Sequence, residues 1–397
     1  MRRATPRRLK RFVCRQLRLA AYLVSPGDGR PRPRIPAAAL LWAQLIGQVL
    51  REAAFHAIEA LVRSPARRAL GVSHRFGDDA LGYFTAQCDP TPTRQALVQA
   101  VRWAKRNKAF EAARFIGLAL DGTAVGRCAT ARCPLCRPQR AAAPAGPGYD
   151  HRLVLLTVVG TGLTLPVDVE PYGPGDSEYA AGQRLLGRAV AALGARFATY
   201  VVVDGEFATA PFLHTAGDRG LRVVARLKAN LPELTAAVQA RFGGRAPTAT
   251  FQIGGNRVEL WDADDFDPWE RLRWPTVRVL RYRQAQPDGT VVTTDWLTDF
   301  PVRQVSARSL YLLAKSRWEV ENQGFNDGKV RYGLAHIRHH HAASLLLCWL
   351  LVALGLTIER LYRLRYLHRG PHTPPTAMGL VRLLRLSLGA PLELDTS

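Results

Sequence analysis

Five short apolar runs between residues 115 and 228 most constrain the fold of this chain of 397 residues. Each run is rich in aliphatic residues, most of them β-branched or leucine, and is bounded by turn-forming residues, which favours a β-strand. The runs cover residues 115–120, 153–159, 163–169, 200–203 and 222–228. Segments 177–194 and 209–219 have helical spacing instead. The order predicts a β-β-β-α-β-α-β unit, an α/β fold whose mixed sheet is flanked by helices.

The first 110 residues differ from this unit in charge and in pattern. They hold 21 basic and 6 acidic residues, so they carry +15 of the total net charge of +23. Segments 38–63 and 93–110 have helical spacing. The first eighteen residues contain eight cations and no acid, interleaved with apolar residues, which indicates a short amphipathic helix. Residues 1–110 therefore read as an all-helical basic domain whose partner is a polyanion: nucleic acid, an acidic membrane surface or an acidic protein.

The rest of the chain divides into four segments that differ in composition and hydrophobic pattern. Residues 111–230 contain the strands described above, 231–302 are β-rich and irregular, 303–360 are helical, and 361–397 form a basic tail with a short helix at 376–388. Residues 342–358 are uncharged, yet they fall short of the roughly 20 residues that a bilayer requires. We therefore expect a buried core helix there and no membrane partner. Six cysteines are too few for a disulfide scaffold, which fits a reducing, cytoplasmic compartment.

Two aspartates follow apolar strands, and a helix supplies a third carboxylate. Asp121 and Asp204 each end a run and precede glycine; ends of strands in α/β sheets are where catalytic groups collect. The alternative is that Asp-Gly only marks a turn. Arg317 and Glu321 share one helix face with Phe325, and Lys329 extends the row. A solvated ladder of ion pairs is the alternative for that face.

These segments resemble a known family. LDG at 120–122, VVVDGEF at 201–207 and RWEVENQGFNDGK at 317–329 look like the DDE transposases of bacterial insertion sequences, specifically the insertion-sequence-four group. The resemblance covers about residues 115–360 and implies an RNase-H-like catalytic core with a β-rich insertion. The family signature is Tyr-x2-Arg-x3-Glu-x6-Lys, in which Arg317 and Glu321 match. Ala314 occupies the tyrosine position, with Tyr311 one turn earlier, and Lys329 comes one residue late.

The resemblance also implies the chemistry. Asp121, Asp204 and Glu321 would hold two Mg²⁺ or Mn²⁺ ions, with Asp121 bridging both, because hard cations prefer oxygen ligands. Arg317, Lys329 and Tyr311 would contact DNA phosphates. The reaction would free a 3′-hydroxyl at a transposon end and join it to target DNA.

The implied partners are double-stranded DNA, as terminal inverted repeats and as target, and a second protomer in a homodimer on DNA. The implied location is the bacterial cytoplasm, at the nucleoid. The alternatives are a catalytically inactive or domesticated DNA-binding protein and a metal-dependent DNA nuclease.

Trp296, in the β-rich insertion, is the candidate for stacking on a flipped base, as the family uses such a tryptophan. The alternative is a strand residue packed in the core of the insertion, and three other tryptophans compete for the role: Trp261, Trp269 and Trp274.

A cysteine cluster follows the first strand. Cys128, Cys133 and Cys136 form C-x4-C-x2-C, and His151 is the nearest candidate for a fourth ligand of Zn²⁺. A redox pair or three unliganded thiols are the alternatives. His336 and the run 339–341 are expected to be phosphate-contacting or surface groups rather than metal ligands.

Overall fold

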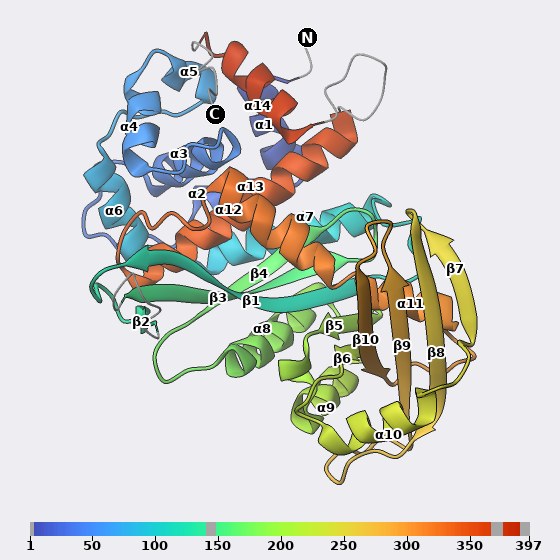
Figure 1. The fold of residues 1–397 in the computed structure, drawn as a ribbon. Coiled ribbons are helices and arrows are strands. Elements are labelled where there is room, and N and C mark those ends of the chain that lie inside the picture. Colours follow the sequence, from blue (N-terminus) through green and yellow to red (C-terminus); the bar gives the residue numbers. More distant parts are fainter. Residues whose placement is uncertain (1–3, 140–147, 367–375, 390–397) are drawn as a thin grey trace.

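A computed structural model describes residues 4–139, 148–366 and 376–389 of the chain (Figure 1). Its centre is a mixed sheet of five strands: β1 (Gly117–Cys128), β3 (Tyr149–Val159), β4 (Leu165–Tyr172), β5 (Tyr200–Val203) and β6 (Arg222–Arg226). These strands lie in the order β4-β3-β1-β5-β6, with antiparallel pairing from β4 to β1 and parallel pairing from β1 to β6. The predicted order of strands and helices, and the predicted mixed sheet, are confirmed.

The β-rich insertion continues this sheet. β10 (Val291–Thr298) pairs antiparallel with β6, so the sheet extends through β9 (Val277–Ala285), β8 (Asn256–Phe266) and β7 (Ala249–Ile253). A short strand, β2 (Arg137–Pro138), pairs with β3 at the other side. Helix α10 (Pro232–Phe242) begins the insertion and was not anticipated. The insertion is therefore fixed to the core through backbone hydrogen bonds.

Helices cover both faces of the central strands (Figure 1). α8 (Glu178–Leu193) and α9 (Ala210–Asp218) lie on one face, and α7 (Thr91–Arg106) and α13 (Ala342–Tyr366) on the other. The hydroxyl of Ser177 accepts from the amide of Ala180 and caps α8, which satisfies one of the unpaired amides that every helix start leaves. The flanked sheet is the architecture expected for the α/β class.

Helix α13 is the apolar segment that composition alone could assign to a membrane. It is the one described helix long and apolar enough to cross a bilayer, but 83% of its most apolar window is buried inside the protein. Its charged end is also buried: the guanidinium of Arg360 donates to Asp327 at 2.8 Å, and the Tyr332 hydroxyl donates to Glu359 at 3.0 Å. Since buried charges require partners, this pairing confirms a core helix.

The N-terminal helices form a group beside α13 (Figure 1). They are α1 (Pro6–Arg11), a π-helical turn (Phe12–Gln16), α2 (Ala20–Val24), α3 (Ala37–Val49), α4 (Phe55–Arg63), α5 (Ala66–Leu70), α6 (Asp78–Gln87) and α7. The predicted amphipathic start is confirmed over residues 4–18, where Leu9 and Phe12 are buried; Arg2 and Arg3 lie outside the described residues. The single helix expected over 38–63 is wrong, because the chain breaks at Arg51, whose φ is 65°.

The C-terminal part consists of α11 (Ala307–Lys315), a π-helical segment (Val320–Asn326), α12 (Asp327–Tyr332), α13 and α14 (Ala377–Leu386). The short helix expected at 376–388 corresponds to α14, which is tied back to the N-terminal helices by Arg385, whose guanidinium lies 2.6 Å from Glu52. Residues 367–375 and 390–397 of the expected basic tail lie outside the described residues. One hydrophobic core runs through the N-terminal helices, the sheet and α13, across the boundary expected at residue 110.

Candidate active site and a cysteine–histidine cluster

Strand register places the two aspartates at neighbouring positions. The parallel pairing of β1 with β5 ends at Leu120 and Val203, so Asp121 and Asp204 are the next residues on adjacent strands. From the sequence, Asp121 was expected to end its strand. That expectation is wrong, because β1 continues past Asp121 to Cys128 as a partner of β3. Asp121 and Asp204 therefore occupy equivalent positions where the parallel ladder stops.

The glycines after these aspartates allow close approach of side chains, and Gly205 also begins a short 3₁₀ turn in which the Phe207 amide donates to the Asp204 carbonyl at 3.1 Å. Neither Gly122 nor Gly205 has a positive φ, the backbone geometry that turn glycines supply. A Cβ at Gly122 would lie 2.2 Å from the carboxyl carbon of Glu178, and a Cβ at Gly205 would lie 2.6 Å from the Lys228 side chain. The Asp-Gly pairs thus let further charged groups reach the carboxylates.

Arg317 joins Asp121 to Glu321 across the fold. Its guanidinium donates to Asp121 Oδ2 at 3.0 Å and to Glu321 Oε1 at 2.6 Å, although Asp121 and Arg317 are 196 residues apart. The Arg317 side chain is only 5% exposed, and its Nε has no partner. The prediction that Asp121 and Glu321 lie together is thereby supported by geometry.

Asp204 has a partner of its own on the next strand. The ammonium of Lys228 donates to Asp204 Oδ2 at 2.5 Å, while Asp204 Oδ1 is buried and has no hydrogen-bond partner. An unpartnered buried carboxylate oxygen is costly. Asp204 Oδ1 is therefore a carboxylate oxygen that could bind a cation.

The two aspartates have opposite pKa shifts. Burial raises the pKa of Asp121 to about 7, and repulsion from Glu178 and Glu321 adds to this, while Arg317 acts in the other direction. Burial also pushes the pKa of Asp204 upward, but the hydrogen bonds from Lys228 and from the Gly205 amide outweigh it, so that pKa is lowered. Perturbed carboxyl groups that share a site are a feature of functional sites.

Glu178 is a carboxylate of this site that the sequence analysis missed. It lies in the first turn of α8 against Gly122, and its Oε2 accepts from the Tyr172 hydroxyl at 3.1 Å. Burial and the nearby Glu206 raise its pKa. An acid in the first helical turn, just after a serine cap, looks like an ordinary helix start, and no local signal distinguishes it.

A π-helical segment explains why Lys329 comes one residue late. Residues Val320–Asn326 wind with i to i+5 bonding, the form that one extra residue in an α-helix produces. Beyond this segment, the ammonium of Lys329 donates to Thr123 Oγ1 at 2.6 Å. Thr123 is two residues from Asp121 and shares its face of β1. The wider turn therefore returns the lysine to the carboxylate face.

Two predicted DNA contacts are not brought to the site. Tyr311 is buried, its hydroxyl donates to Gln284 at 3.0 Å, and its ring packs on Phe251 and Tyr282. Trp296 is fully buried in β10, so the prediction that it stacks on a flipped base is not supported.

Trp318 lies beside the site and was missed. It is half-buried, its ring is 5.8 Å from that of Trp296, and the cationic groups of Lys315 and Arg317 lie 4.4 and 5.1 Å from it. The sequence could have indicated Trp318 as a residue of the site, because it directly follows Arg317 in the signature segment.

A second cluster joins two cysteines to two histidines. The ligand atoms of Cys133, Cys136, His151 and His340 all lie within 4.8 Å of one another. The two Sγ atoms are 3.7 Å apart, and His151 Nε2 is 3.2 and 3.4 Å from them. Cys128, expected as a ligand, is not part of this set. His340, expected at the surface, takes its place, because the loop before α13 folds back over the hairpin.

Most of the chain is similar to known proteins. A family model described as a transposase DDE domain matches residues 114–358. No curated protein has a sequence that matches the chain. Among solved structures, the chain is similar to a piggyBac transposase, seen by cryo-EM in a synaptic complex with hairpin DNA. That similarity has a TM-score of 0.47 and 11% identity, and covers 97% of this chain and 80% of the other.

Proposed function

This chain belongs to the transposase DDE-domain family, and on that premise we propose that Asp121, Asp204 and Glu321 are the catalytic carboxylates of a DNA transposase. The enzyme class follows from the family: transposases of this kind break and form phosphodiester bonds. The observation that supports the three residues is the register of β1 and β5, together with the Arg317 bridge between Asp121 and Glu321. The sheet order β4-β3-β1-β5-β6 supports the RNase-H-like interpretation of the core.

The donor set fits hard divalent cations. All three groups are carboxylates, which Mg²⁺ and Mn²⁺ prefer, and Asp204 Oδ1 is a buried oxygen that lacks a partner. Two such ions, when bound, would activate the attacking oxygen and stabilise the leaving oxygen. Asp121 is the central residue of the three, as Arg317 ties it to Glu321 and strand register places it beside Asp204.

Arg317 and Lys329 are proposed to bind phosphate. A guanidinium makes paired hydrogen bonds with phosphate oxygens as well as with carboxylates. We propose that Arg317 exchanges at least one of its two carboxylate contacts for a DNA phosphate, which frees that carboxylate. Lys329, on the same face of β1 through Thr123, supplies a second positive charge. Burial lowers the pKa of Lys329 and favours a compensating anion nearby.

The test uses linear DNA that carries the two ends of the element, taken from the sequence flanking the gene. Wild-type protein with Mg²⁺ should cut these ends and join them to a plasmid, and Asp204→Ala should bind the same DNA without cutting it. Cutting by Asp204→Ala would refute the assignment. Cutting without joining would indicate a nuclease, and binding without cutting by the wild type would indicate an inactive DNA-binding protein.

A homodimer on double-stranded DNA, at the bacterial nucleoid, is part of the proposal. It is supported by the need of a transposase to bring two ends together. The mass of the complex with end DNA, measured by light scattering, tests it: a complex of one protomer with one end would contradict a dimer.

We propose that Cys133, Cys136, His151 and His340 bind Zn²⁺. With a Zn–S bond of about 2.3 Å and a Zn–N bond of about 2.0 Å, tetrahedral geometry requires about 3.8 Å between sulfurs and about 3.5 Å between sulfur and nitrogen. The observed 3.7 Å and 3.2–3.4 Å are close to these values. A disulfide would require about 2.0 Å instead. Four protein ligands make a closed, structural site.

Metal content separates the two possible ligand sets. Protein purified without chelator should hold one equivalent of zinc. Cys133→Ser and His340→Gln should lose it, and Cys128→Ser, the matched control, should retain it. Loss of zinc in Cys128→Ser together with retention in His340→Gln would show that the set expected from the sequence is the correct one.

A further inference from the structure

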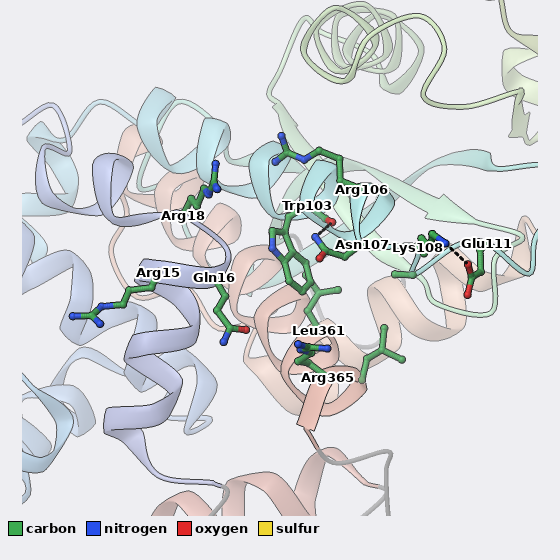
Figure 2. A pocket seen from close by; sticks show the side chains of 12 residues that line it. Arg15, Gln16, Arg18, Trp103, Arg106, Asn107, Lys108, Glu111, Leu361 and Arg365 are labelled. Atoms are coloured by element: carbon green, nitrogen blue, oxygen red, sulfur yellow. Dashed lines mark hydrogen bonds and ion pairs between the residues drawn. The ribbon is translucent and has the colours of Figure 1, made fainter.

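A basic groove lies among helices of the N-terminal region and α13 (Figure 2). Its volume is about 930 Å³. Three segments distant in sequence line it: the end of the N-terminal π-helical turn, the end of α7 with the loop that follows, and the end of α13. Its basic residues are Arg15, Arg18, Arg106, Lys108 and Arg365, and its one acid is Glu111.

The arginines of this groove are not engaged within the protein. Arg15, Arg18, Arg106 and Arg365 are exposed, and in the described part of the chain no ion pair or hydrogen bond involves their side chains. The single acid, Glu111, lies 4.0 Å from Lys108, and both are largely exposed. An exposed pair of this kind is weak. The groove therefore presents a nearly uncompensated positive charge.

The basic surface continues along α7. A second, smaller groove shares Arg106 and adds Arg102 and Arg196, both exposed and unpaired among the described residues. Arg102 and Arg106 are one turn apart on one face of α7. Lys105 links α7 to the segment before β5, because its ammonium donates to the carbonyl oxygens of Arg196 and Phe197 at 2.7 and 2.6 Å. The result is a strip of cations rather than a single site.

The groove is built with some backbone strain. Arg18 and Lys108, which line it, have φ values of 59° and 60°, in the left-handed region that favours glycine. Only four described residues other than glycine have positive φ. A side chain kept at such positions costs energy, and such strain collects at functional sites. The floor between the cations is apolar, formed by the half-buried Trp103 with Leu361 and Leu364.

The groove cannot hold the phosphate that is cut. The loop that lines it leads into the start of β1 at Gly117, and Arg196 precedes the start of β5, whereas Asp121 and Asp204 lie at the far end of the parallel pairing. Four residues of strand span about 13 Å, which is roughly four base-pair steps of duplex DNA. A DNA contact at this strip is thus a contact with a different part of the DNA.

We propose that this strip, from Arg365 and Arg15 across α7 to Arg196, binds the phosphate backbone of duplex DNA outside the active site. Guanidinium groups on a rigid helical surface fit phosphates, and the apolar floor fits deoxyribose. The interaction is independent of base sequence, because phosphate contacts position the protein and do not read bases. The proposal rests on the DNA transposase function and assigns to it a second DNA contact.

The experiment measures the affinity of the full chain for a 30-base-pair duplex of random sequence as a function of salt, in EDTA so that no cutting occurs. The test variant replaces Arg15, Arg18, Arg106 and Arg365 by Gln. The matched control replaces four exposed arginines in and just after the insertion by Gln, at positions 245, 271, 273 and 303. Both variants lose the same charge, and thermal unfolding checks that both are folded.

Each phosphate contact contributes about 0.9 to the slope of log affinity against log salt. The groove variant should therefore lose about 3 to 4 from this slope and bind at least about tenfold more weakly at physiological salt, and the control variant should change little. Equal slopes in the groove variant and the wild type would overturn the proposal and favour an acidic protein partner. Because the experiment measures binding and not cutting, its result is independent of the assignment of the catalytic carboxylates.

Discussion

Replacing Asp121 by Asn should stabilise the metal-free protein, by an amount that grows with pH. The raised pKa of Asp121, about 7 against an ordinary 3.8, means that the folded protein holds this proton more tightly than the unfolded chain. The protonated Asp121 carboxyl makes its full contribution to the free energy of unfolding at low pH. This contribution falls as the pH rises through 3.8 and is fully lost above 7. A shift of about three units corresponds to about 4 kcal/mol.

Asn resembles the protonated carboxyl in shape and charge, so the variant avoids this loss. Linkage gives an advantage of about 1.7 kcal/mol for Asp121→Asn at pH 5 and about 4 kcal/mol at pH 8. The assay is urea unfolding of both proteins in EDTA at the two pH values. A difference that does not grow by about 2 kcal/mol between pH 5 and pH 8 would refute the reasoning.

Asp204→Asn is the matched control. The pKa of Asp204 is lowered, so its contribution is present above the ordinary pKa and is lost only in acid. Between pH 5 and pH 8 the effect of Asp204→Asn should therefore stay constant. Both variants should fail to cut DNA. A catalytic group that destabilises the resting protein is the expected cost of gathering acids for metal binding.

Two further predictions concern contacts that hold the site. Gly122→Ala should destabilise the protein by about 1–3 kcal/mol in urea unfolding, because the new methyl group would meet the Glu178 carboxyl; Gly82→Ala, in an open helical position, should instead stabilise it by about 0.5–1 kcal/mol. Equal effects would contradict the close approach. Arg360→Gln should cost about 1–3 kcal/mol, since the carbonyls of Thr164 and Gln323 lose their buried donor while Asp327 keeps its ion pair with Arg331; a loss below about 0.5 kcal/mol would show that these carbonyls are not buried in solution.

The strand and helix order of the core was readable from the sequence because it depends on local patterns. Apolar runs of four to seven residues between glycines and aspartates predicted β3 to β6 within a few residues, and Ser177 marked the start of α8. The apolar run 342–358 predicted a buried helix for the same reason. Asp121 and Asp204 stood out because each follows such an apolar run, and Glu321 because it shares a helix face with Arg317 at the spacing of the family signature.

Other features depend on contacts between distant segments, which leave no local pattern. His340 joins Cys133 and Cys136 only because the loop before α13 returns to the β1–β3 hairpin, more than 200 residues away in sequence. Trp296 and Tyr311 looked available for DNA, yet the insertion strands bury both. The break at Arg51 and the π-helical segment also follow from packing around α13 and against the sheet.

The sequence by itself indicated the candidate residues for the chemistry: three carboxylates, an arginine at family spacing, a lysine one residue beyond it, and a surplus of positive charge. Only the tertiary structure decided how they are used. Strand register places Asp121 beside Asp204, the guanidinium of Arg317 closes the site, and the arginines of three separate segments form one groove. Local patterns reflect the preferences of single segments, whereas distances between charges are set by packing, and the distances decide the electrostatics of the site.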